Sequence, residues 1–369
     1  MTILIFFAVL VLLILVHEFG HFIVAKKSGI RVDEFGIGFP PKITGKKYGE
    51  TEYTLNWLPI GGFVRIWGED PTEAHYTDGP ESERSFVKQP RYIQAAVLVA
   101  GVAMNVLLAY VLYVASYMIG MPTAVGPEAV AAGEETQLIV TSVIEQSPAG
   151  AVLQAGDEIV ALGNASSQLA DGAITPDSVS SFIALSGESE VVMDVVRRGE
   201  RLEIVVTPEA GIIPDDPERI AAGFTMSLVG TVALPLHEAL VAGAVRTCHA
   251  LTDVVVGLWS IISGAVAGTA DISNIAGPVG IVGLVGDAAA LGFVWLMMFS
   301  AFISLNLAVI NLLPIPALDG GRLVFVAIEA ITRRPINPKF ATRLNQIGFV
   351  ALLALMLMVT VNDVLRIVG

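Results

Sequence analysis

Two histidines and a glutamate stand together in the first apolar part of the sequence, as His17-Glu18-Phe19-Gly20-His21. On a helix, side chains four positions apart share a face, so both imidazoles could bind one Zn²⁺ ion. Glu18 could then accept a proton from a water molecule on that ion. The alternative is a pair of histidines packed against neighbouring helices. Ionisable residues inside a membrane are costly and mark functional sites, so three of them at zinc-ligand spacing favour a metal site.

A catalytic zinc ion needs a third protein ligand and keeps a fourth position open for water. Asp319 is the best candidate, because the apolar stretch before it is predicted to end at the membrane depth of His17. Pro314 and Pro316 would break that helix and let Asp319 turn back toward the first apolar stretch. Glu329 is the second choice. The alternative for Asp319 is an ordinary Asp-Gly turn that leaves the membrane.

Four long apolar stretches must position these residues, at 3–25, 93–121, 288–310 and 347–361. Each of the first three supplies the ~20 residues of a spanning helix, and the fourth would draw on its flanks. Hydrophobic residues make up 54% of the 369 residues and charged residues only 15%, against about 25% charged in soluble domains. We therefore predict a polytopic α-helical membrane protein with four transmembrane helices.

The net charge and the cysteine count exclude other classes of protein. A net charge of −14 would repel phosphate backbones, so nucleic acid is not an expected partner. The single cysteine excludes a disulfide framework and a cysteine-rich metal site.

Basic residues near the membrane predict the orientation, since Lys and Arg mark the cytoplasmic side. Residues 24–92 carry ten Lys/Arg, several of them next to the first two stretches, and are predicted to lie inside. Residues 119–290 carry five Lys/Arg against 21 Asp/Glu and are predicted to lie outside, as are both termini. Residues 314–345 are again basic and predicted inside. The metal site would then lie near the cytoplasmic face.

Residues 235–270 could be mistaken for a fifth span, because their second half is uncharged. A fifth span would reverse the membrane orientation of all later segments and place the basic segment 322–343 outside. We therefore interpret residues 235–270 as an amphipathic helix that lies in the membrane interface.

Two segments are predicted to be rich in β-strands. Residues 42–66 contain short strand candidates separated by glycines. Residues 124–210 form a small soluble domain, with strands at 138–140 and 159–162, a helix at 176–186, and a hairpin of 191–196 with 202–207. The predicted domains are a first transmembrane pair (1–121), this insert (124–210), a linker (211–287) and a second transmembrane pair (288–369).

The His17–His21 motif, the Asn311–Gly321 stretch and Gly277–Ile281 together resemble the site-2 proteases, which are M50-type intramembrane zinc metalloproteases. The resemblance is strongest to the bacterial regulator-of-sigma-E protease branch. It extends to Val99–Asn105 and Asn362-Asp363 and covers nearly the whole chain. It implies an enzyme of the bacterial inner membrane that cuts transmembrane segments of single-span proteins, such as an anti-sigma factor or a signal-peptide remnant.

The same resemblance implies roles for individual residues. The zinc ligands would be His17, His21 and Asp319, the catalytic base Glu18, and the substrate-binding residues Asn311, Gly61 and Gly62. Asn311 would help to hold the substrate or polarise its carbonyl. Residues 42–66 would form a membrane-associated β-hairpin whose edge pairs with an unwound substrate.

The insert resembles the PDZ modules of extracytoplasmic proteases, through Ser147-Pro148-Ala149 and Ala155–Ile159. The insert has room for one PDZ domain, whereas many relatives of this branch carry two. Such a domain could bind a peptide at its sheet edge, or it could only filter substrates by size. A second departure is Val102, where the family pattern has a proline after the glycine.

Two other functions compete with a protease. A membrane-anchored PDZ adaptor with an inactive metal site would have no need to keep His17, Glu18, His21 and Asp319 intact. A zinc transporter would need more polar residues across the second and fourth stretches. The expected partners are therefore a substrate transmembrane segment, a peptide at the PDZ domain and the lipid bilayer.

Overall fold

The computed structural model describes residues 1–368, apart from 70–81, 127–129, 131–134, 145, 165–166, 170–173, 198, 213–218 and 269–276. The chain forms two compact units. The first joins Met1–Ser116 to Leu236–Gly369, and the second is Tyr117–Pro235. Parts of the predicted linker, 213–218 and 269–276, lie outside the described residues.

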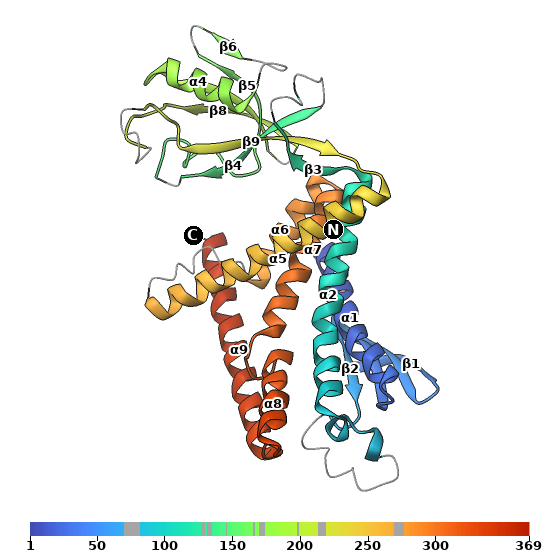
Figure 1. The fold of residues 1–369 in the computed structure, drawn as a ribbon. Coiled ribbons are helices and arrows are strands. Elements are labelled where there is room, and N and C mark those ends of the chain that lie inside the picture. The colour runs from blue at the N-terminus through green and yellow to red at the C-terminus, as the bar shows by residue number, and fades with distance from the viewer. Residues whose placement is uncertain are drawn as a thin grey trace. The chain divides into compact units, whose positions relative to one another are not determined.

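Long apolar helices dominate the first unit (Figure 1). Among the described residues, five helices are long and apolar enough to cross a membrane: α1 (Thr2–Lys27), α2 (Arg91–Ile119), α5 (Leu236–Ala267), α7 (Phe293–Leu312) and α9 (Pro338–Val368). Two shorter helices are α6 (Pro278–Leu291) and α8 (Asp319–Thr332). The prediction of a multi-pass helical membrane protein is confirmed.

The fifth long helix, α5, covers the residues that we interpreted as an interfacial helix. It runs across the direction of α2 and α9 rather than along it (Figure 1). Its first half packs on the C-terminal part of α2, where a Cβ on Gly243 would lie 2.5 Å from a methyl group of Val114. The Tyr110 hydroxyl donates a hydrogen bond to the Leu240 carbonyl oxygen (3.3 Å) at the same crossing.

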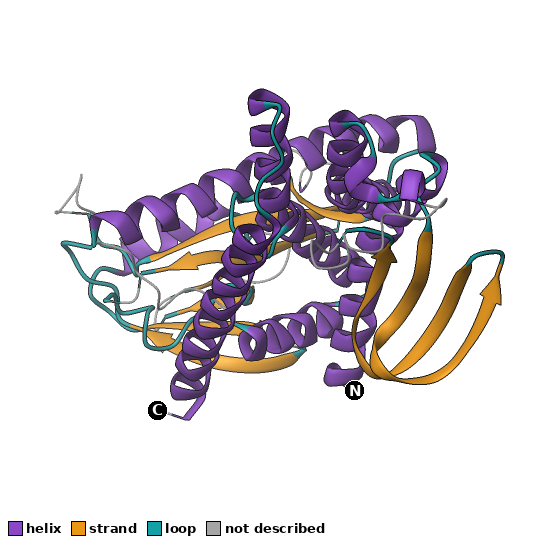
Figure 2. Ribbon diagram, turned by 90° about the horizontal axis from the view of Figure 1, so that it is seen from below, coloured by secondary structure: helices purple, strands orange, loops and turns teal. Residues whose placement is uncertain are grey.

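The β-hairpin of the first unit is longer than residues 42–66, because β1 (Val32–Tyr48) begins well before them and β2 (Thr51–Ile66) completes it. Residues 34–37 of β1 pair with residues 62–65 on one side and with 52–55 on the other. Residues 34–37 therefore lie between two segments of β2, and residues 61–66 form an outer edge of this small sheet. Helix α1 packs mainly on β2, and Figure 2 shows these strands curving away beside the helices.

A buried apolar cluster joins the hairpin to the helices. Its members come from the end of α1, the turn after it, both hairpin strands, the 3-10 turn before α2, α2 and α8: Ala25, Ile30, Val32, Ile66, Phe86, Val97, Leu98 and Val326. The residues from α2 and α8 are far from the others in sequence, so this cluster holds the elements that carry the candidate site.

In its described residues, the second unit is a seven-stranded sheet with helix α4 (Pro176–Ser186) packed on it. Its strands are β3 (Met121–Ala124), β4 (Thr136–Val143), β5 (Glu158–Gly163), β6 (Gln168–Leu169), β7 (Val191–Arg197), β8 (Glu200–Val206) and β9 (Phe224–Val232). Their order is β3-β9-β4-β5-β7-β8, and β6 pairs with β5. Helix α4 (Pro176–Ser186) buries Val179 and Phe182 in the core. The strands, helix and hairpin predicted for residues 138–207 are all present.

Strand β9 lies within the range 211–287, which we predicted to be a linker. It pairs with β3 on one side and β4 on the other, and Leu228 on it is buried in the core. Apolar and polar residues alternate over most of Phe-Thr-Met-Ser-Leu-Val-Gly-Thr-Val, as expected for a half-buried strand. The β-rich unit therefore continues past residue 210.

Candidate metal centre

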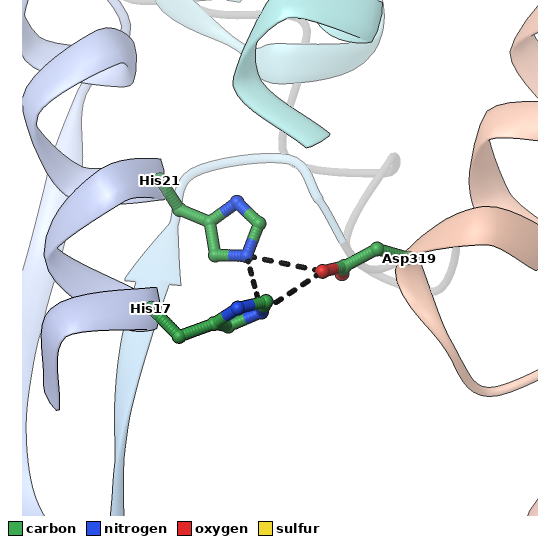
Figure 3. A group of neighbouring side chains, drawn as sticks. All are labelled: His17, His21 and Asp319. Carbon is green, nitrogen blue, oxygen red and sulfur yellow. Dashed lines mark hydrogen bonds and ion pairs between the residues drawn. The ribbon is translucent and has the colours of Figure 1, made fainter. Parts of the chain in front are cut away.

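Helix α1 brings His17 and His21 onto one face, as their four-residue spacing predicts. Both residues are buried, with 6% of each residue's reference surface exposed. Their Nε2 atoms lie 3.1 Å apart. Asp319 Oδ2 lies 3.0 Å from His17 Nε2 and 3.2 Å from His21 Nε2 (Figure 3). Three potential ligand atoms thus form a nearly equilateral triangle.

A break between α7 and α8 carries Asp319 to this place. Helix α7 ends at Leu312, and α8 begins at Asp319 after the turn that contains Pro314 and Pro316. A Cβ on Gly320 would lie 2.2 Å from the Leu313 carbonyl oxygen, so only glycine allows α8 to fold back against this turn. The predicted proline break is therefore present, and it ends at the predicted aspartate.

Glu329, the second-choice ligand, is engaged elsewhere. One of its carboxylate oxygens lies 2.9 Å from Arg91 Nη1, and the other accepts a hydrogen bond from the Ile336 backbone N–H (2.8 Å). Among the described residues, His17, His21 and Asp319 are the group of three with metal-ligand geometry.

The triangle fits a zinc ion. Tetrahedral coordination with bonds of about 2.0–2.1 Å requires ligand atoms about 3.3 Å apart. The observed separations are 3.0, 3.1 and 3.2 Å. Two neutral imidazoles and one carboxylate form a ligand set suited to zinc, and three protein ligands leave a fourth position open.

Helix α2 contacts both histidines through their Nδ1 atoms. The α2 residues that make these contacts had no role in the sequence analysis. The Val97 carbonyl oxygen lies 2.8 Å from His21 Nδ1, and Asn105 Nδ2 lies 3.2 Å from His17 Nδ1. Gly101 lies between them, where a Cβ would be 2.5 Å from His21 Nε2. Positions 97, 101 and 105 share one helix face, so a glycine and an asparagine four residues apart in an apolar helix could have indicated this contact.

The catalytic-base candidate contacts the hairpin. Glu18 Oε2 accepts a hydrogen bond from the Val64 backbone N–H (3.1 Å). Val64 pairs with Phe35 on its inner side, and its N–H faces outward from the edge formed by residues 61–66. Glu18 therefore lies against the outer edge of the hairpin, one residue from a potential metal ligand.

The predicted substrate-binding residues lie in two places. A Cβ on Gly61 would be 2.9 Å from Ile14 Cδ1, and one on Gly62 would be 3.0 Å from Leu15 Cδ2, so the two glycines allow the edge segment to approach α1 closely. Asn311 lies in the last turn of α7 and is half-buried. Its side chain makes no hydrogen bond to another described residue.

An ion pair joins α8 to the end of the hairpin, and the sequence analysis did not identify it. Arg322, one turn after Asp319, pairs with the Glu69 carboxylate. Its Nη2 also donates a hydrogen bond to the Glu69 backbone oxygen (2.6 Å). The helix that carries Asp319 is thus attached to the segment that directly follows β2, the strand that contacts Glu18.

Comparison of the chain with known proteins identifies its family. The model of Peptidase family M50 matches residues 5–355. The zinc metalloprotease RasP of Geobacillus kaustophilus is 30% identical over 428 residues, which cover 95% of each chain. The regulator of sigma-W protease RasP of Bacillus subtilis is 30% identical over 439 residues, which cover 99% of this chain and 98% of that one.

Among solved structures, the PDZ domain of an SdrC-like protein from Listeria innocua matches 24% of this chain and 92% of that chain, at 20% identity and a TM-score of 0.19. The PDZ assignment of the β-rich unit stays a prediction. The family match and the full-length relatives confirm the resemblance to the site-2 proteases. The chain belongs to peptidase family M50 and is a zinc metalloprotease of that family.

Proposed function

We propose that this enzyme hydrolyses peptide bonds in transmembrane segments of single-span membrane proteins, with Zn²⁺ bound by His17, His21 and Asp319. The main support for this proposal is the triangle of ligand atoms, which lie 3.0–3.2 Å apart. The long apolar helix α1 supplies two of these atoms, and Asp319, at the break between α7 and α8, supplies the third. The Bacillus subtilis relative is named as a regulator of sigma-W protease. An anti-sigma factor is therefore a candidate substrate here.

The residues around the site have distinct roles in hydrolysis. When bound, Zn²⁺ supplies a Lewis acid that polarises the scissile carbonyl and lowers the pKa of a coordinated water molecule to about 7. Glu18 accepts a proton from the attacking water and delivers it to the leaving amine. Asn311 holds the substrate from the end of α7.

The hairpin edge holds the substrate in an extended conformation. A peptide bond in a helix is enclosed by its own hydrogen bonds, so the substrate must unwind before it can be cut. Residues 61–66 offer an edge to which an extended segment can add as a strand. Because Val64 contacts Glu18 and Gly61 and Gly62 lie against α1, a strand added there runs beside the catalytic carboxylate. The hairpin associates with the membrane through exposed apolar side chains such as Trp57, which is 66% exposed.

The hydrolytic function can be tested with full-length protein and a panel of single-span substrates. We expect cleavage within the transmembrane segment, loss of cleavage with a chelator, and recovery with added Zn²⁺. Glu18→Gln should keep bound zinc but lower cleavage by about 10²–10⁴-fold, because an amide cannot accept the proton. Near-normal turnover by Glu18→Gln, or cuts confined to soluble parts of the substrates, would contradict the proposal.

We further propose that four helices span the bacterial inner membrane and that α5 lies in the interface, with both termini and the β-rich unit outside. The crossing of α5 over α2 supports this arrangement. Single cysteines introduced at Glu83, Glu200 and Arg334 in a Cys248→Ser background test it by labelling from one side. Four spans predict that positions 83 and 334 react from the cytoplasmic side and position 200 from the other. If α5 spans, position 334 reacts together with position 200.

For the β-rich unit, we propose a single PDZ domain that begins near residue 124. Peptide binding and filtering by size make different predictions. A peptide binder has measurable affinity for a segment of the substrate's soluble part. A filter has none, and cleavage then depends only on the size of that soluble part.

A further inference from the structure

The two ring nitrogens of His17 face different helices. Nε2 faces the ligand triangle, 3.0 Å from Asp319 Oδ2 and 3.1 Å from His21 Nε2. It is therefore the atom that would bind the ion. Nδ1 faces α2 and lies 3.2 Å from Nδ2 of Asn105, whose side chain is fully buried.

Metal binding decides which nitrogen carries the hydrogen. A neutral imidazole has one N–H group, so a histidine that binds an ion through Nε2 carries its hydrogen on Nδ1. That N–H group requires a hydrogen-bond acceptor. The amide of Asn105 has one, Oδ1, and this oxygen is buried with no hydrogen-bond partner among the described residues. A half-turn of the amide brings Oδ1 to His17 Nδ1 and hardly changes its shape.

We propose that Asn105 is a positioning residue that accepts a hydrogen bond from His17 Nδ1–H through Oδ1 and so holds the tautomer and ring orientation that zinc binding requires. The inference rests on the proposed zinc site. His21 supports it, because its Nδ1 lies 2.8 Å from the Val97 carbonyl oxygen, a group that can only accept. Helix α2 thus supplies one acceptor to each histidine, a main-chain oxygen for His21 and a side-chain oxygen for His17.

The surroundings of Asn105 keep it at this distance. Its main-chain oxygen accepts a hydrogen bond from the Ser304 hydroxyl of α7 (2.8 Å), and both residues are fully buried. Gly101, one turn earlier, lets α2 come close to both imidazoles. A buried amide without a partner is costly, so Asn105 is itself stabilised by the hydrogen bond to His17.

Zinc affinity of the full-length protein, measured by competition with a chromogenic chelator, tests the proposal. Asn105→Leu keeps the approximate volume but has no acceptor, and we expect its zinc affinity to fall by about 10–100-fold. Asn105→Asp has two acceptor oxygens and no donor, and should bind zinc nearly as well as the wild type. Ser116→Ala removes the hydrogen bond from another buried serine of α2 to the Leu112 carbonyl oxygen, about three turns beyond Asn105, and should leave zinc affinity unchanged.

The aspartate variant shows whether Asn105 acts as a hydrogen-bond acceptor or only fills space in the structure. Equal losses in Asn105→Asp and Asn105→Leu would overturn the proposal, because the amide nitrogen or the packing would then matter instead. Wild-type affinity in Asn105→Leu would also overturn it. If Asn105→Leu does not fold, Asn105→Asp decides alone, and a loss of zinc affinity of about 10–100-fold in it would overturn the proposal. Folded wild-type protein that binds no zinc would refute the zinc site itself, which is a different result.

Discussion

Adding one methyl group at Gly101 should disturb the metal centre without touching a ligand. A Cβ at this position would lie 2.5 Å from His21 Nε2 and 2.8 Å from His17 Cε1, whereas ordinary contacts begin at 3.4 Å. The His21 ring would have to move by roughly 1 Å, several times the ~0.2 Å within which metal–ligand distances are held. We expect Gly101→Ala to lower zinc affinity by about 10–100-fold and cleavage by about 10²-fold.

The assay is chelator competition for zinc, with thermal unfolding measured on the same samples. Alanine favours a helix over glycine by about 1 kcal/mol, so loss of helix stability would not explain the effect. Gly283→Ala on α6 is the matched control, because a Cβ there has no atom within 4 Å. If Gly101→Ala bound zinc like the wild type, the α2 backbone would not be holding the two rings in place.

Two further predictions concern carboxylates. Asp319→Asn should lose bound zinc during dialysis against a weak chelator. Glu329→Gln should keep its zinc, because Glu329 pairs with Arg91 instead. The reverse result would show that the wrong carboxylate was chosen as the third ligand. Hydrogen bonds from Arg84 and Lys26 lower the pKa of Glu50 from 4.5 to about 2. Glu50 should therefore stabilise the fold by about 1 kcal/mol above pH 4.5 and lose this effect as the pH falls toward 2. Unfolding of Glu50→Gln and wild type should converge over that range, and a constant difference would contradict the assignment.

Local sequence patterns predicted some elements to the residue. Helix α4 occupies 176–186 as predicted, because Thr175 and Ser178 form reciprocal capping hydrogen bonds and Pro176 begins the first turn. The start of β1 was missed because two acidic residues and Gly36 interrupt the alternation of apolar residues after Val32. The number of spans was not decidable from composition, since α5 is long and apolar enough to cross and differs from the other long helices in its direction.

Site residues could be predicted where they are close together in the sequence or stand next to an unusual residue such as proline. His17 and His21 follow from helix spacing, and Asp319 from the proline break that precedes it. The contacts from α2 and the ion pair of Arg322 with Glu69 depend on which helix faces join, which the periodicity of one helix does not specify. An asparagine in an apolar helix marks a helix face as a candidate for function, but only the packing brings Asn105 within 3.2 Å of His17 Nδ1.

Five consecutive residues of α1 contact three other elements, α2, α8 and the hairpin, so the whole site depends on the rotation of this helix. His17 and His21 face α2 and Asp319, Glu18 contacts the edge of the hairpin, and a Cβ on Gly20 would lie 2.3 Å from the Ala100 oxygen of α2. Phe19 is 40% exposed and stacks on Phe22, which in turn contacts the aromatic rings of the hairpin. Because each residue turns a helix by about 100°, a shift of one position would separate both histidines from Asp319 and Glu18 from the hairpin edge together. The close contacts at Gly20 and Gly101 oppose such a rotation, so we expect substitutions of these two glycines to lower activity through the placement of the site residues.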